Sequence, residues 1–382
     1  MIPCNKQRLL DTFLSLVRLS SEYGQEKNVQ DYIAAELKKL GAKVYIDHAG
    51  RTYPTNAQGN VIGRLQGTLK SKPFVLVTHM DTVSPGKNIK PVVKKDCVVS
   101  DGTTILGGDD KAGIAIVLEL MRTLREQKLP HPPIEAIFTL NEEAGMAGCK
   151  NLEYHKIKGR EGLVLDGEEL GEMQVQGPAV NTIEVWVRGL AAHAGVCPEK
   201  GISALEVAAD ALSRMKLGRI DAQTVANFAI IQGGKATNIV TDEIYLKGEA
   251  RSLQEHKLEK QNAHIRACFE KSVQKFTKKI DGKIYKPSFK MTLFKRYSAV
   301  NVSKKHPVVQ AVVRAAKKQG FTICLTASGG GCDANVLAGQ GFILPNLGVG
   351  VRHCHTVHEK LNLKEFYAAF WIVLDTILSY KK

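Results

Sequence analysis

Closely spaced cysteines are missing from this sequence, although it contains eight cysteines in 382 residues. No two of them form a Cys-x-x-Cys pair, which excludes a zinc ribbon and leaves no disulfide framework. We therefore expect small buried hydrophobic side chains, in a reducing compartment, at Cys4, Cys97, Cys149, Cys197, Cys268, Cys324, Cys332 and Cys354.

Long apolar segments are also missing. No stretch approaches the roughly 20 apolar residues of a membrane span. The first six residues, MIPCNK, do not start the apolar core of a signal peptide. The expectation is a cytoplasmic protein without a membrane partner.

Acidic residues are scarce between positions 256 and 305, where fourteen Lys and Arg accompany only three Asp and Glu. The whole chain has a net charge of +15, which could suit a nucleic-acid surface. This stretch contains no recognised nucleic-acid motif and only a few aromatic residues. A solvated helix face is the simpler interpretation, so no nucleic-acid partner is expected.

Hydrophobic residues (44%) and charged residues (24%) are present in the amounts typical of soluble globular proteins. The chain is longer than the roughly 250–300 residues at which a single core stops growing. More than one domain is therefore expected.

Histidines and carboxylates follow several predicted strands. The first of these strands, 72–78, is a continuous apolar run of the kind that is buried on both faces of an α/β sheet. Open α/β sheets bind ligands at the carboxyl ends of their strands, so these side chains are expected to meet. They are His79 and Asp81 after 72–78, Glu142 and Glu143 after 134–140, Asp166 after 163–165, and a histidine among 353–358 after 341–351.

Residues 180–294 have a different pattern. Strands and helices alternate there in the order βαββαβ, which predicts a ferredoxin-like α/β sandwich. A Gly-Pro break at 177–178 and a basic break near 295–296 are the expected hinges. The fold class is therefore α/β: a catalytic domain of residues 1–179 and 295–382, interrupted by this inserted domain.

The stretch 107–113, GGDDKAG, places two carboxylates and a lysine between glycines, before an apolar run that indicates a buried helix. The glycines permit a sharp turn. A carboxylate at such a turn is either a helix N-cap or a ligand. Taken alone, the stretch favours the cap.

The candidates together form a set of imidazoles and carboxylates without cysteine. Such a set suits catalytic zinc or manganese better than structural zinc. Two ions about 3.5–4 Å apart would need a bridging carboxylate. Of the adjacent glutamates, one can bind metal while the other takes a proton from the attacking water. Asp81 is well placed to hold the second imidazole nitrogen of His79.

With these motifs the sequence resembles the dinuclear zinc metallopeptidases that include peptidase T, carboxypeptidase G, the aminoacylases and succinyl-diaminopimelate desuccinylase. The resemblance covers essentially the whole chain and is closest to the peptidase T branch. It rests on HMD at 79–81, DDKAG at 109–113, EE at 142–143 and LDGE at 165–168.

The resemblance implies a role for each residue of the site. Asp109 would bridge two divalent ions, zinc or else manganese or cobalt, and Glu142 would be the base. His79 and Asp166 would complete one metal site, and Glu143 with a late histidine the other. The family's late histidine stands four residues before a glutamate, which selects His355, with His353 and His358 as competitors.

Residues on the substrate side also resemble the family. His193 resembles a lid histidine that steadies the oxyanion, although it could instead cap its own turn. Asn238 and Arg251 resemble residues that grip the substrate's carboxylate or backbone. Gly330 and Gly331 belong to a glycine-rich substrate loop, in which Cys332 stands where many relatives carry Thr or Ser.

The expected function is that of an exopeptidase that removes residues from the amino end of short peptides, with a possible homodimer through the inserted lid or dimerisation domain. An amidohydrolase that deacylates N-acyl amino acids is the alternative, because it would share the whole metal site. A basic nucleic-acid-binding protein with a vestigial hydrolase fold is disfavoured, because every ligand and the base are present.

Overall fold

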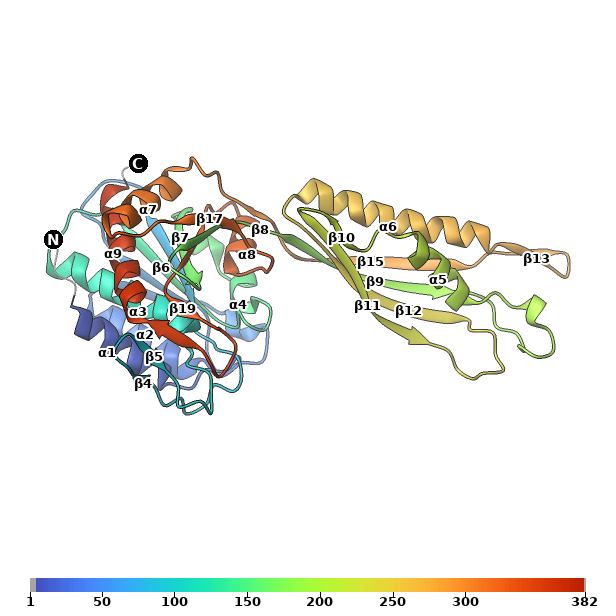
Figure 1. The fold of residues 1–382 in the computed structure, drawn as a ribbon, viewed down its shortest axis with the longest axis horizontal. Coiled ribbons are helices and arrows are strands. Elements are labelled where there is room, and N and C mark those ends of the chain that lie inside the picture. The colour runs from blue at the N-terminus through green and yellow to red at the C-terminus, as the bar shows by residue number, and fades with distance from the viewer. Residues whose placement is uncertain (1–4, 381–382) are drawn as a thin grey trace. The chain divides into compact units, whose positions relative to one another are not determined.

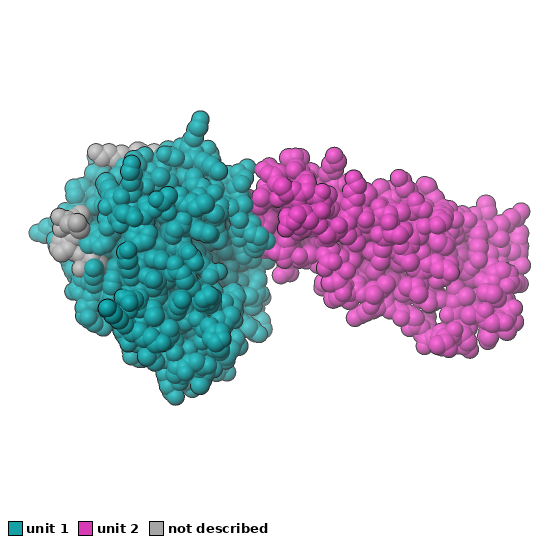
Figure 2. All heavy atoms as spheres, in the orientation of Figure 1, with its two compact units in different colours: residues 1–177, 300–382 teal, residues 178–299 magenta. Residues whose placement is uncertain are grey.

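The computed structural model describes residues 5–380. The chain divides into two compact units, residues 1–177 with 300–382 (unit 1) and residues 178–299 (unit 2), shown in two colours in Figure 2. Unit 2 interrupts unit 1 in the sequence. The break predicted near Lys295 lies inside strand β15 (Ser288–Tyr297), so the chain returns to unit 1 only at 299–300.

A nine-stranded sheet forms the centre of unit 1 (Figure 1). Its strand order is β1-β2-β6-β3-β7-β18-β8-β16, with β17 paired to β8. The neighbours β6, β3, β7 and β18 run parallel, so their carboxyl ends lie along one edge. The bounds are Lys43–Ile46 (β1), Val61–Leu65 (β2), Phe74–His79 (β3), Ile134–Thr139 (β6), Glu161–Gly167 (β7), Glu172–Gly177 (β8), Val300–Asn301 (β16), Cys324–Ala327 (β17) and Asn346–Gly348 (β18).

Helix α3 (Gly108–Glu126) packs against β3 and β7 and also contacts two other helices, α1 and α9. It is buried along most of its length, which explains its apolar run from Ile114 to Leu118. Strand β3 is buried at all six positions. The other helices of unit 1 are α1 (Lys6–Val17), α2 (Lys27–Lys39), α4 (Ala147–Lys150), α7 (Pro307–Lys318), α8 (Asp333–Ala338) and α9 (Leu363–Ser379), with 3-10 turns η1 (Ala49–Arg51) and η2 (Tyr154–Lys156).

A second, small sheet of unit 1 has the order β19-β20-β5-β4. It joins the hairpin of β4 (Val92–Val93) and β5 (Cys97–Val99) to β19 (Val351–Arg352) and β20 (Lys360–Asn362). The loop between β19 and β20 carries the histidines of the segment 353–358. Within the described residues, no helix is both long and apolar enough to span a membrane.

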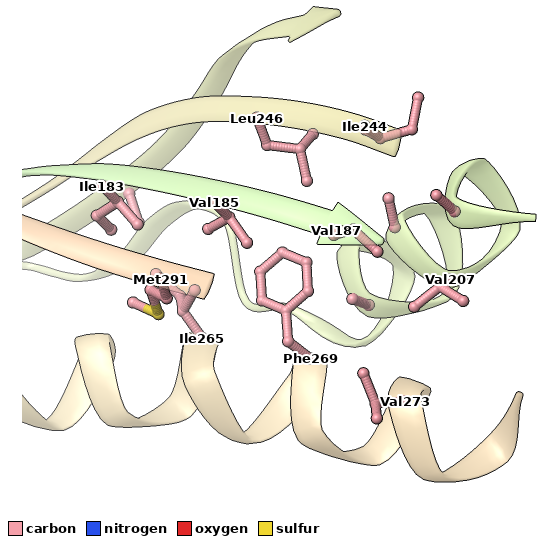
Figure 3. Close-up of a cluster of buried hydrophobic side chains, with 14 of the residues drawn as sticks. Ile183, Val185, Val187, Val207, Ile244, Leu246, Ile265, Phe269, Val273 and Met291 are labelled. Carbon is pink, nitrogen blue, oxygen red and sulfur yellow. The ribbon is translucent and has the colours of Figure 1, made fainter. Parts of the chain in front are cut away.

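Unit 2 is an antiparallel sheet in the order β10-β11-β12-β9-β15, with two helices against it. Figure 3 shows Phe269 of helix α6 pointing toward Val185 and Val187 of β9, within a cluster of buried apolar side chains. Unit 2 also contains strand β10 and the β13–β14 hairpin, which the predicted βαββαβ order did not include. The bounds are Ala179–Arg188 (β9), Pro198–Lys200 (η3), Ala204–Arg214 (α5), Gly218–Asp221 (β10), Thr224–Gly233 (β11), Glu243–Ser252 (β12), Glu255–Lys275 (α6), Lys278–Ile280 (β13) and Lys283–Tyr285 (β14).

The seven described cysteines are all free thiols, but only Cys149 and Cys268 are buried. The prediction of small buried side chains is therefore wrong for Cys324, which is exposed. This residue begins β17, which pairs with β8 alone and leaves its other edge open. Cys4 lies outside the described residues.

Candidate metal centre

The predicted ligands come from five backbone segments that meet at the carboxyl edge of the parallel strands. His79 ends β3, and Asp166 is the next-to-last residue of β7. Glu143 follows β6, Asp109 stands in the turn that opens α3, and His355 lies on the β19–β20 loop. This is the edge at which the sequence places the site.

Asp109 lies between two histidines and offers one carboxylate oxygen to each. Its Oδ1 is 2.9 Å from Nε2 of His79, and its Oδ2 is 3.3 Å from Nε2 of His355. On the first side, Oδ1 of Asp166 is 3.4 Å from the same His79 nitrogen. On the second side, Oε1 of Glu143 is 2.9 Å from the His355 nitrogen. Two clusters joined by one carboxylate have the arrangement that a pair of bridged metal ions requires.

The chemistry of these donors fits two divalent cations. Two imidazole nitrogens and three carboxylates, without a thiolate, are the ligands of catalytic rather than structural zinc, and they also suit manganese. Ligand atoms of His79, Asp109 and Glu143 lie within 4.8 Å of one another, so the two clusters adjoin at Asp109.

Asp110 also lies near His79 and Asp166, but its carboxylate has a different use. Its Oδ2 accepts the backbone N–H of His79 at 3.2 Å, and its Oδ1 accepts that of Gly113 at 3.2 Å. The second bond is a helix cap. The turn therefore contains both a cap and a candidate ligand, on adjacent residues. Gly107 makes this possible with a left-handed φ of 70°.

Glu359 holds the backbone of this turn. Its buried carboxylate accepts N–H groups from Leu106 at 2.8 Å, Gly107 at 2.7 Å and Asp109 at 3.0 Å. Burial raises the pKa of Glu359 to about 7, although the three donors oppose that rise. The sequence marked Glu359 only as a spacing partner of His355. No local pattern could reveal its role, because its partners are some 250 positions away.

Asp81 differs in detail from the prediction. Nδ1 of His79 is 3.0 Å from the backbone carbonyl oxygen of Asp81, whereas the Asp81 carboxylate is 3.5 Å away. That carboxylate instead accepts the backbone N–H groups of Glu142 at 2.9 Å and Glu143 at 3.1 Å. The main chain thus orients the imidazole, and the Asp81 side chain positions the pair of glutamates.

Crowding of buried carboxylates shifts their pKa values. Burial raises the pKa of Asp166 to about 8, and the charge of Asp109 adds to the rise. Burial would also raise the pKa of Asp109, but hydrogen bonds from His355 and His79 outweigh it and hold that pKa below its usual range. Hydrogen bonds to Asp109 and Glu143 raise the pKa of His355 to about 11. Bound cations would neutralise this excess of negative charge.

Glu142 is the candidate base. Its side chain is only 9% exposed, and burial, followed by the charge of Asp166, raises its pKa well above the ordinary value. A raised pKa suits a carboxylate that must accept and then release a proton near neutral pH.

A cavity of about 440 Å³ opens over these groups. The five candidate ligands, Glu142, Gly330 and Gly331 all line it. The lining residues that were not predicted include Glu168, Gln174, Asn346 and Cys354. For Asn346 and Glu168 a signal existed. Asn346 is a polar residue within an apolar run, and Glu168 stands two positions after Asp166.

Unit 2 brings His193 close to Asn238. The backbone N–H of Ala194 donates to the carbonyl oxygen of Asn238 at 2.8 Å. Nδ1 of His193 accepts the N–H of Gly195 at 3.2 Å, so the ring proton is on Nε2, which can then act as a donor. This bond within the turn is also the one that a capping role would require.

Arg251 lies elsewhere in unit 2. It pairs with Glu249 at 2.7 Å and stands near the far end of β12, whereas Asn238 is in the loop before that strand. Eight residues of strand separate positions 243 and 251, or roughly 26 Å. The structure therefore does not bring Asn238 and Arg251 together within one unit.

An α/β sheet that presents two clusters of histidine and carboxylate side chains, a shared carboxylate and a neighbouring buried glutamate has the arrangement of a two-metal hydrolase. The sequence profile of Peptidase family M20/M25/M40 matches residues 75–379, and the chain belongs to this family. The family resemblance and the α/β fold class predicted from the sequence are thereby confirmed.

Three similar proteins cover nearly the whole chain. Uncharacterized protein YqjE of Bacillus subtilis (strain 168) is 39% identical over 376 residues, which are 98% of each chain. The crystal structure of aminopeptidase PepT from Bacillus cereus ATCC 10987 is 38% identical, with a TM-score of 0.90 and 98% of each chain covered. That of a tripeptidase from Staphylococcus aureus subsp. aureus Mu50 is 35% identical, with a TM-score of 0.86 and the same coverage.

Proposed function

We propose that the protein is an aminopeptidase that removes the first residue from short peptides, with two divalent metal ions, zinc being the first choice. The observation that carries this proposal is the Asp109 carboxylate, which offers one oxygen to the His79 cluster and the other to the His355 cluster. The similar aminopeptidase and tripeptidase support the choice of substrate.

Metal ions held by His79, Asp166, Asp109, Glu143 and His355 would polarise the scissile carbonyl and the attacking water. Glu142 takes a proton from that water as its oxygen bonds to the carbonyl carbon. The same carboxyl then gives the proton to the departing amine as the C–N bond breaks. Asp81 contributes by fixing the backbone of both glutamates, so that one side chain faces the ligands and the other the substrate.

Residues of unit 2 would hold the substrate and its developing charge. The Nε2–H of His193 is a suitable hydrogen-bond donor to the scissile carbonyl oxygen. Asn238 and Arg251 would donate to the backbone or the carboxylate of the substrate. His193 and Asn238 lie at the end of the unit 2 sheet opposite to residues 178 and 299, where the chain enters and leaves. A homodimer through unit 2 would let one subunit supply these groups to its partner's site, which supports the dimer proposal.

The free thiols suit a reducing compartment and so support a cytoplasmic location.

The test is hydrolysis of a tripeptide panel beside N-acyl amino acids, with enzyme reconstituted separately in zinc, manganese and cobalt. We expect release of the amino-terminal residue from tripeptides and no activity in a chelated sample that elemental analysis shows to be metal-free. Full activity of that metal-free sample, or cleavage of N-acyl amino acids alone, would contradict the proposal.

A further inference from the structure

The aminopeptidase activity proposed above needs a group that recognises a free α-amine, and the five candidate metal ligands do not supply one. In a peptide, the amine nitrogen of the first residue is about 2.5 Å from the scissile carbonyl carbon. Its binding group must therefore lie immediately beside the metal ligands. At neutral pH the amine is an ammonium group, so a carboxylate is the matching partner.

Glu168 meets this requirement. It stands two positions after Asp166, just beyond the end of β7, and both side chains line the same cavity. The chain bends at Glu168, which is exposed, and two peptide units keep its Cα within roughly 7 Å of that of Asp166. An ammonium group next to the reacting carbonyl would then lie between Asp166 and Glu168.

The remaining carboxylates of the cavity are already engaged. Asp109, Glu143 and Asp166 contact the histidines. Among the described residues, only Glu142 and Glu168 line the cavity as carboxylates without a hydrogen-bond or ion-pair partner of their own side chain. Glu142 is the proposed base, so Glu168 is the carboxylate that remains to bind the substrate's ammonium group.

Among the described residues, neither lysine nor arginine lines the cavity or the adjoining hollow of about 230 Å³, which shares Glu168, Gln174 and Asn346 with it. Glu169, the next acidic residue, points to Arg352 at 3.2 Å. The wall around Glu168 thus favours a cation and disfavours a second carboxylate.

We propose that Glu168 binds the α-ammonium group of the substrate and thereby selects peptides with a free amino terminus over N-acylated compounds. This inference rests on the proposed aminopeptidase function and decides between it and deacylation. An acyl group replaces the ammonium by a neutral amide, which leaves the carboxylate without its charge partner.

The test compares Ala-Ala-Ala with acetyl-Ala-Ala-Ala on the zinc-loaded enzyme and on two variants, Glu168→Gln and Glu172→Gln. Glu172 lines only the adjoining hollow and is the matched control. For Glu168→Gln we expect kcat/KM on the free tripeptide to fall about 10–100-fold, mainly through KM, because the ammonium contact is made equally before and during the reaction. Activity on the acetylated peptide, metal content and the Glu172→Gln variant should stay at wild-type values.

A wild-type KM for the free tripeptide in Glu168→Gln would overturn the inference, as would an equal loss on both peptides. Failure of the proposed function has a different signature, which is a wild-type enzyme that cleaves the acetylated peptide at least as fast as the free one. That result would overturn the function and the inference together.

Discussion

Adjacent acidic residues of this protein serve different purposes, and the backbone decides which residue serves which. In the pair Asp109-Asp110, the first carboxylate faces two histidines and the second accepts backbone N–H groups. In the pair Glu142-Glu143, the second contacts His355 and the first lines the cavity. Chemically identical neighbours thus acquire separate roles from the direction in which each side chain leaves the chain.

The role of Glu142 predicts a variant that keeps its metals but loses turnover. Glu142→Gln preserves the shape and removes the base, so kcat should fall by roughly 10²–10⁴-fold. Elemental analysis should show unchanged metal content. Loss of metal along with activity would mean that the two glutamates have the opposite roles.

The position of Asp109 predicts a different outcome. Asp109→Ala removes an oxygen from both clusters, so we expect reduced occupancy of both metals, measured by elemental analysis after dialysis against a weak chelator. Loss of one metal with full retention of the other would make Asp109 a terminal ligand instead.

At the scale of structural elements, the turn before α3 and the two helices of unit 2 depend on carboxylates that join distant segments. Glu359 holds the turn from the loop beyond β19. Asp210 of α5 accepts hydrogen bonds from Arg214 at 2.8 Å and from Ser272 of α6 at 2.7 Å, and it pairs with Lys275 of α6. Each carboxylate joins elements that local sequence does not connect.

Glu359→Gln tests the first of these links. The Glu359 carboxylate uses one oxygen to accept the N–H groups of Leu106 and Gly107 and the other to accept that of Asp109. A glutamine keeps only one acceptor oxygen, so its NH₂ group would face either the N–H of Asp109 or those of Leu106 and Gly107. We expect a loss of about 1.5–3 kcal/mol in stability, measured by urea denaturation, together with weaker metal binding. Unchanged stability with unchanged metal affinity would show that the turn holds its shape without the charge.

Asp210 gives a pH-dependent prediction. Its hydrogen bond from Arg214, and then those from Lys275 and Ser272, lower its pKa in the folded state. In the unfolded chain the pKa of an aspartate is about 3.9. The stabilising effect of Asp210 is therefore complete above that pH and is lost as the pH falls through and below it. Asp210→Asn should lower the Tm of unit 2 at pH 7, and the difference should shrink below about pH 3.

The control for this measurement is Asp281→Asn, whose carboxylate is 71% exposed and pairs with Lys200 on the surface. That variant should change the Tm little at either pH. A Tm difference for Asp210→Asn that is constant from pH 7 to pH 2 would assign the effect to packing rather than charge.

At the scale of the whole molecule, the question is whether one subunit or two contribute residues to each active site. Within unit 2, His193 and Asn238 lie far from Arg251. Roughly 26 Å of strand lies between the two groups. One substrate no longer than a tripeptide cannot contact both ends of a single unit 2. If His193, Asn238 and Arg251 all bind the substrate, as proposed, this geometry is the physical reason to expect groups from two subunits at each site.

Mixing two inactive variants tests that expectation. Glu142→Gln and His193→Ala should each be nearly inactive, the second with kcat reduced about 10²–10³-fold for one oxyanion donor. If His193 acts on the partner's site, denaturing and refolding the two together should restore about a quarter of the wild-type activity, because half of the dimers are mixed and each has one complete site.

The control is the same refolding of each variant alone, with the oligomeric state measured by light scattering. No recovery in a mixture that contains mixed dimers would place His193 in its own subunit's site or in a structural role.

The sequence by itself determined the chemistry of the site and the elements that carry it. His79, Glu143 and Asp166 could be named as candidates because each follows a predicted apolar strand, and the carboxyl ends of such strands meet at one edge of a sheet. Asp109 follows no such strand, and its role as a ligand rather than a helix cap came from the family resemblance. Helix and strand periodicity likewise indicated the βαββαβ order of residues 180–294. Short elements such as β10 and the β13–β14 hairpin were missed, because two to four residues carry too little periodicity to detect.

Only the tertiary structure decided how these parts are oriented and which distant groups support them. It brought His355, rather than His353 or His358, to Asp109 and Glu143. It also turned the Asp81 carboxylate toward the glutamate backbone and placed Glu359 beneath the Asp109 turn. These outcomes depend on hydrogen bonds between segments far apart in the chain, and such contacts exist only after the sheet has assembled.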